Sequence, residues 1–158
     1  MNRDIVYLTF EEVKSVYAKT IDKSGGGLSG IRDEGGILAT LDFAQNDDYY
    51  PSFTDKLSYL VYGFCHGHYF LDGNKRIALT IGVYFLLKNG YYCAAQNFMK
   101  AVEAIIYHVA AGKIDRELLT EILICIVEGF DYNEELKIEL AKAISEHIDP
   151  RQPSTMTQ

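Results

Sequence analysis

The sequence has few cysteines, and their positions exclude a disulfide framework. The three residues Cys65, Cys93 and Cys125 are odd in number, lie far apart and form no Cys-x-x-Cys pair. This usage is typical of proteins kept in a reducing compartment. We therefore expect a cytoplasmic protein whose cysteines serve as small core residues.

Long apolar runs and an excess of positive charge are also missing. No run reaches the roughly 18 apolar residues that a membrane helix requires, and the apolar stretch at 5–8 is too short for a signal peptide. The chain has 15 Lys and Arg against 22 Asp and Glu, which gives a net charge of −7. A broad nucleic-acid surface would need a basic stripe. The sequence therefore predicts neither a membrane nor a nucleic-acid partner.

What is present fits one helical domain. The 158 residues are the size of a single domain, and a hydrophobic content of 48% is enough for a core. Apolar residues recur at helical spacing behind capping residues. Helices are predicted at 10–22 behind the capping box Thr9 to Glu12, at 34–45, from Ser52 onward, at 74–89, from Asn97 to Gly112, after Asp115, and from Asn133 to about His147, with an extended link at 91–93. Residues 149–158 are expected to be disordered.

The most informative segment is His68-Tyr69-Phe70-Leu71-Asp72-Gly73-Asn74-Lys75-Arg76, which lies directly before the apolar helical run 77–87. A helix N-terminus offers unpaired N–H groups and the positive end of the dipole, so it binds anions. Lys75 and Arg76 oppose that dipole unless an anion is bound, which favours a phosphate ligand. Asp72 is a candidate magnesium ligand, and His68 is a candidate general base.

This segment resembles the signature of the Fic/Doc (Fido) family, roughly His-x-Phe-x-[Asp/Glu]-[Gly/Ala]-Asn-[Gly/Lys]-Arg. His68, Phe70 and the run 72–76 fill every position, and the residues that follow look most like the death-on-curing (Doc) branch. The resemblance covers about residues 5–128. It implies an all-α fold, a bundle of about six or seven helices with a small β-hairpin flap. It also implies a single domain over 1–148, in which a C-terminal helix at about 133–147 is an addition.

The resemblance further implies a role for each residue of the motif. The side chain of His68 would deprotonate the target hydroxyl, Asp72 would hold Mg²⁺, and Phe70 would anchor the loop in the core. The phosphates of ATP would be bound by Gly73, Asn74, Lys75 and Arg76.

Partners are implied in the same way. In the glycine-rich flap, Ser24, Ser29 and Ile31 are expected to dock a protein target that carries a hydroxyl acceptor, and strand addition is a suitable docking mode. The Doc branch also implies an antitoxin partner, a separate protein that inserts an inhibitory helix.

The residue at position 79 bears on the reaction. AMP-transferring members of the family usually carry a second arginine three residues after the first, where this chain has Leu79. Leu79 and Lys75 follow the Doc pattern, which moves phosphate, whereas Gly73 follows the AMP-transferring pattern. We therefore expect a Doc-like phosphotransferase acting on Ser, Thr or Tyr, as in the toxin of a toxin–antitoxin pair. Protein adenylylation is the alternative.

Other readings stay open at this point. A Fido domain can act as a non-catalytic interaction module, and His66, His68 and Asp72 together are a candidate transition-metal site. Many family members are silenced by a helix with the pattern [Ser/Thr]-x-x-x-Glu-[Gly/Asn]. The chain has two Glu-Gly pairs, at 34–35 and 128–129. Neither fits the pattern, because the residues four positions before the glutamates are Gly30 and Ile124 rather than Ser or Thr. The additional C-terminal helix is a further candidate to cover the groove into which an antitoxin would insert its inhibitory helix.

Overall fold

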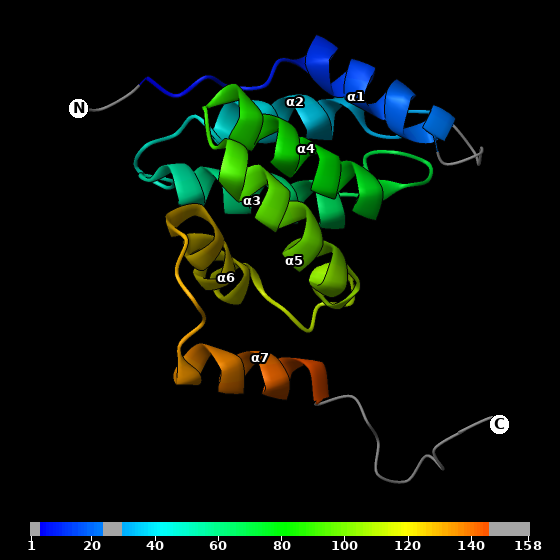
Figure 1. The fold of residues 1–158 in the computed structure, drawn as a ribbon. Helices are drawn as coiled ribbons and strands as arrows, with labels where there is room; N and C mark the ends of the chain where they lie inside the picture. The colour runs from blue at the N-terminus through cyan, green and yellow to red at the C-terminus, as the bar shows by residue number, and fades with distance from the viewer. Residues whose placement is uncertain (1–3, 24–29, 146–158) are drawn as a thin grey trace, which may run out of the picture.

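The computed structural model describes residues 4–23 and 30–145 (Figure 1). The described part of the chain is all-α and contains no strand, which confirms the predicted fold class. None of its helices is long and apolar enough to cross a membrane. The predicted tail at 149–158 and the predicted helix end near His147 lie outside the described residues. The helices are α1 (Phe10–Lys23), α2 (Glu34–Phe43), α3 (Phe53–His66), α4 (Asn74–Lys88), α5 (Tyr92–Ala110), α6 (Arg116–Glu128) and α7 (Glu134–Ser145).

Capping side chains determine where most of these helices begin. In α1 the Glu12 N–H donates to Thr9 Oγ1 at 3.2 Å, and the Thr9 N–H donates to Glu12 Oε1 at 3.1 Å, which is the predicted capping box. Ser52 and Asp55 form the same reciprocal pair at the start of α3. Side-chain oxygens of Asp33, Asp115 and Asn133 accept from first-turn N–H groups of α2, α6 and α7. The local sequence therefore fixes these starts.

The start of α5 differs from the prediction. The stretch 91–93 was expected to be an extended link ahead of a cap at Asn97, but α5 already begins at Tyr92. Ala94 and Ala95, both strong helix formers, are buried in this first turn. The ring of Tyr91 stacks on that of Phe53 with centroids 4.5 Å apart. Packing against α3 therefore extends the helix towards its N-terminus, and Asn97 lies inside it.

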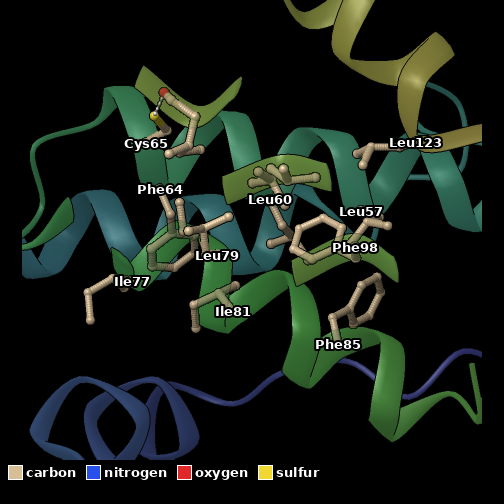
Figure 2. Close-up of a cluster of buried hydrophobic side chains, with 14 of the residues drawn as sticks. Leu57, Leu60, Phe64, Cys65, Ile77, Leu79, Ile81, Phe85, Phe98 and Leu123 are labelled. Atoms are coloured by element: carbon tan, nitrogen blue, oxygen red, sulfur yellow. Dashed lines mark hydrogen bonds between the residues drawn. The ribbon is translucent and has the colours of Figure 1, made fainter. Parts of the chain in front are cut away.

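Helix α4 lies at the centre of the bundle. It packs against α3 and α5 and, on another side, against α1. Ile77, Ile81 and Phe85 are fully buried and belong to the hydrophobic core cluster drawn in Figure 2. At Gly82 the backbone comes so close to Phe98 of α5 that a Cβ atom would collide with its ring. Because α4 is held by the core in this way, its N-terminus is a rigid platform for the motif.

Helix α7 lies at the opposite end of the molecule from α1 (Figure 1). It packs on α6, and Leu136 is its buried side chain.

Candidate functional site

The motif loop at 67–73 connects α3 to α4 and is tied down by Asn74. The Phe70 N–H donates to Asn74 Oδ1 at 3.2 Å, and Asn74 Nδ2 donates to the Phe70 carbonyl at 3.0 Å. Phe70 itself is only 1% exposed, so it anchors the loop in the core as expected. The second hydrogen of the Asn74 amide remains as a donor. Asn74 was predicted as a phosphate-binding residue, and the structure adds that it organises the loop.

Gly73 gives α4 an open N-terminus. It is the N-cap residue, with φ +78°, and no side chain among the described residues caps the first turn. Glycine adopts this left-handed conformation without the cost that a Cβ atom brings. The first-turn N–H groups, together with the positive end of the helix dipole, can therefore bind an anion that approaches the glycine.

Asp72, directly before Gly73, and His68, at the start of the motif, both have exposed side chains. Asp72 Oδ1 accepts from the Gly73 N–H at 2.7 Å, and Oδ2 has no hydrogen-bond partner among the described residues. His68 has φ +50° and is the only described non-glycine residue with positive φ. Such strain in a non-glycine residue is often found at functional sites.

The two cations of the motif diverge. The Nζ atom of Lys75 lies 5.3 Å from the centroid of the Tyr107 ring on α5. The guanidinium of Arg76 lies instead close to Gly73. A Cβ atom placed on that glycine would be 3.5 Å from Arg76 Nη2. Of the two predicted phosphate-binding cations, the structure brings Arg76 to the glycine and places Lys75 over an aromatic face.

Arg76 also lines a groove between α1, α4 and α5 with a volume of about 580 Å³. The groove is mainly apolar, with Lys19 and Glu103 at its surface, and its lining comprises Val16, Lys19, Thr20, Arg76, Leu79, Thr80, Tyr84, Met99 and Glu103. Helix α7, which packs on α6, does not cover this groove. The idea that the C-terminal helix occupies it is therefore wrong for the described residues.

Residues 30–33 pair with the motif loop. The Leu71 N–H donates to the Gly30 carbonyl at 3.0 Å, and the Arg32 N–H donates to the Tyr69 carbonyl at 2.7 Å. Ile31 and Phe70 form an isolated antiparallel bridge between these bonds. In this type of pair the N–H and C=O of Ile31 face away from the motif loop. The predicted flap hairpin is not shown, and Ser24 and Ser29 lie outside the described residues.

His66 does not join the motif residues. Its Nε2 atom lies 2.6 Å from the Val109 carbonyl, and its ring stacks on Tyr62 at 4.3 Å. The described residues contain no group of three or more His, Cys, Asp or Glu side chains arranged to hold a metal ion. The candidate site of His66, His68 and Asp72 is therefore wrong. A single carboxylate at Asp72 does fit Mg²⁺, because that ion is commonly held by one or two carboxylates and the substrate phosphates.

Sequence reasoning missed the role of Tyr17 on α1. Its ring stacks on Phe70 with centroids 4.4 Å apart and planes 19° apart, and its hydroxyl accepts from the Gly30 N–H at 2.5 Å. No local signal could have shown this, because the three residues lie far apart in the sequence.

A model of the Fic/DOC family matches residues 7–86, the stretch from before α1 into the last turn of α4. A comparison with curated proteins finds no match to the chain.

Proposed function

The chain belongs to the Fic/DOC family, and from this premise we propose that it transfers phosphate from Mg-ATP to a hydroxyl group of a protein. The observation that carries the proposal is the open N-terminus of α4. Gly73 provides no capping side chain there, Asn74 fixes the loop, and Arg76 lies alongside. A site with these donors is suited to phosphate groups.

The proposed reaction is an in-line attack of the protein hydroxyl on the γ-phosphorus. His68 accepts the hydroxyl proton, the new O–P bond forms, and the bond from the γ-phosphorus to the ADP oxygen breaks. The first-turn N–H groups and Arg76 hold the phosphate oxygens. Mg²⁺ held by Asp72 would neutralise further charge on the phosphates. Positioning and charge neutralisation account for most of the catalysis in such transfers.

Leu79 supports phosphate transfer over adenylylation. It is 7% exposed and lies in the core cluster with Phe64 and Ile81, as Figure 2 shows. The position that carries the second arginine in AMP-transferring members is thus an apolar core position here. Gly73 does not weigh against this, because its φ of +78° already favours glycine.

The protein acceptor would dock at Ile31. The backbone groups of Ile31 that face away from the motif loop offer an edge to an extended peptide, and strand addition would place a target residue next to the loop. Ser29 remains a second candidate docking residue.

We further propose that the protein is the toxin of a toxin–antitoxin pair. The mainly apolar groove between α1, α4 and α5 is suited to an amphipathic helix from an antitoxin. An acidic residue of that helix could pair with Lys19 or Arg76, and pairing with Arg76 would compete with phosphate.

The proposal is tested by label transfer from ATP to proteins of a host-cell lysate. We expect His68→Ala to lower the rate by roughly 10²- to 10⁴-fold, the usual contribution of a general base. His108→Ala on α5 is the matched control and should keep the wild-type rate. Equal rates for the wild type and His68→Ala would contradict the proposed role of His68.

A further inference from the structure

Tyr17 connects residues 30–33 to the motif loop from a third element, α1. Its side chain is buried, with 8% exposed. The ring stacks on Phe70, and the hydroxyl contacts both polar backbone groups of Gly30: it accepts from the N–H at 2.5 Å and donates to the carbonyl at 3.4 Å. One side chain therefore contacts the motif loop and the segment that pairs with it.

Gly30 is held from two sides. Its carbonyl accepts from the Leu71 N–H at 3.0 Å, and its N–H is bound by Tyr17. The next residue, Ile31, bridges to Phe70. Without the hydroxyl of Tyr17, the Gly30 N–H would lose this hydrogen bond, and Gly30 would keep only the bond that its carbonyl accepts from the Leu71 N–H. The hydroxyl thus binds the residue that directly precedes the Ile31 edge.

We propose that Tyr17 is a positioning residue for the protein acceptor. Resting on the function proposed above, this means that Tyr17 sets the Ile31 edge at the distance from His68 at which an acceptor hydroxyl meets the base. It does not touch the nucleotide or the reacting atoms. Small misplacements of an acceptor lower transfer rates steeply, so a residue that fixes the edge affects use of the acceptor rather than binding of ATP.

The matched pair of variants is Tyr17→Phe and Tyr50→Phe. The first keeps the ring that stacks on Phe70 and removes the two contacts to Gly30. The second removes another buried tyrosine hydroxyl, one that accepts from Arg116 Nη1 at 3.2 Å away from the motif. Three quantities are measured for each: the affinity for Mg-ATP by calorimetry, label transfer at a series of lysate concentrations, and amide hydrogen exchange at Gly30, Arg32 and Leu71.

For Tyr17→Phe we expect the apparent KM for the lysate acceptor to rise roughly five- to tenfold, the worth of one or two hydrogen bonds. Exchange of the Gly30 amide should accelerate by a similar factor, because its hydrogen-bond partner is gone. The affinity for Mg-ATP and the rate at saturating lysate should stay within about twofold of the wild type, since the loop keeps its Phe70 anchor. Tyr50→Phe should change none of the three quantities.

An unchanged KM with faster Gly30 exchange would overturn the inference, and so would a loss of Mg-ATP affinity that equals the loss of transfer. Failure of the proposed function looks different. In that case the wild-type protein itself transfers no label, and this result would also contradict a role for Tyr17 in positioning an acceptor.

Discussion

The carboxylate of Glu12 joins the start of α1 to the end of α4. Lys88 Nζ lies 2.6 Å from each of its oxygens, the Tyr84 hydroxyl donates to Oε2 at 2.8 Å, and the Thr9 N–H donates to Oε1 at 3.1 Å. Burial alone would raise the pKa of Glu12. The hydrogen bonds from Lys88, Tyr84 and Thr9 outweigh burial and lower the pKa from 4.5 to about 2. The ionised form of Glu12 therefore stabilises the fold.

The two pKa values set the size of the effect. At about 1.4 kcal/mol for each pH unit between them, ionised Glu12 contributes at most roughly 3 to 4 kcal/mol to the free energy of unfolding. The side chains of Glu12 and Lys88 are 23% and 20% exposed, so solvent screening reduces the contribution. We expect Glu12→Gln to lower the free energy of unfolding by about 2 kcal/mol at pH 7. Glutamine also fits the third position of a capping box, so the variant mainly tests the charge.

The sign of the pH dependence follows from the depressed pKa. The contribution of Glu12 is complete above its unfolded pKa of 4.5 and is lost as the pH falls from there towards about 2. Urea unfolding of the wild type and Glu12→Gln at pH 7, 5 and 3 should show a difference in stability that shrinks below pH 5. The other carboxylates titrate in both proteins, so their effect cancels in the difference between the wild type and Glu12→Gln.

The matched control is Glu11→Gln. Glu11 pairs with Lys14 at 2.8 Å, but its side chain is 80% exposed. Exposed pairs of this kind contribute roughly 0–1 kcal/mol, so little change is expected. Equal losses for Glu11→Gln and Glu12→Gln, or a Glu12→Gln difference that stays constant from pH 7 to pH 3, would show that the charge of Glu12 does not stabilise the fold.

Two further substitutions test the packing of α4 and the motif loop. Gly82→Ala should lower the urea midpoint, because the added Cβ would collide with Phe98 and lie 3.0 Å from Val61 Cγ2. Overpacking of this kind costs about 1–3 kcal/mol, which exceeds the gain of about 1 kcal/mol from the higher helix propensity of alanine. A raised midpoint would show that Phe98 moves aside easily. Asn74→Ala should cost about 2 kcal/mol, because it leaves the backbone of buried Phe70 without two partners. It should also lower label transfer, and unchanged transfer would contradict the role of Asn74 in organising the loop.

Much of the fold could be predicted from the sequence because it depends on local signals. The caps at Thr9, Ser52 and Asp115 act within one helical turn, and the helix starts that they predict agree with the structure. The start of α5 could not be predicted in this way. It depends on burial of Ala94 and Ala95 against other helices, which is a tertiary effect.

The candidate site, too, could be predicted only where it depends on the local sequence. The motif residues are consecutive, so their pattern indicated the loop, its glycine and the helix N-terminus that follows. The direction of Lys75 depends on Tyr107, and the position of Gly30 depends on Tyr17. Both contacts join residues of different helices or loops, so neither leaves a trace in the local sequence.

The transferred group is tested most directly with ATP labelled separately at the α- and γ-phosphates. The purified protein is incubated with host-cell lysate and either label, and His68→Ala serves as the control. Phosphate transfer predicts that protein-bound label comes from the γ-labelled ATP only and depends on His68. Protein-bound label from α-labelled ATP would contradict phosphate transfer and establish adenylylation instead.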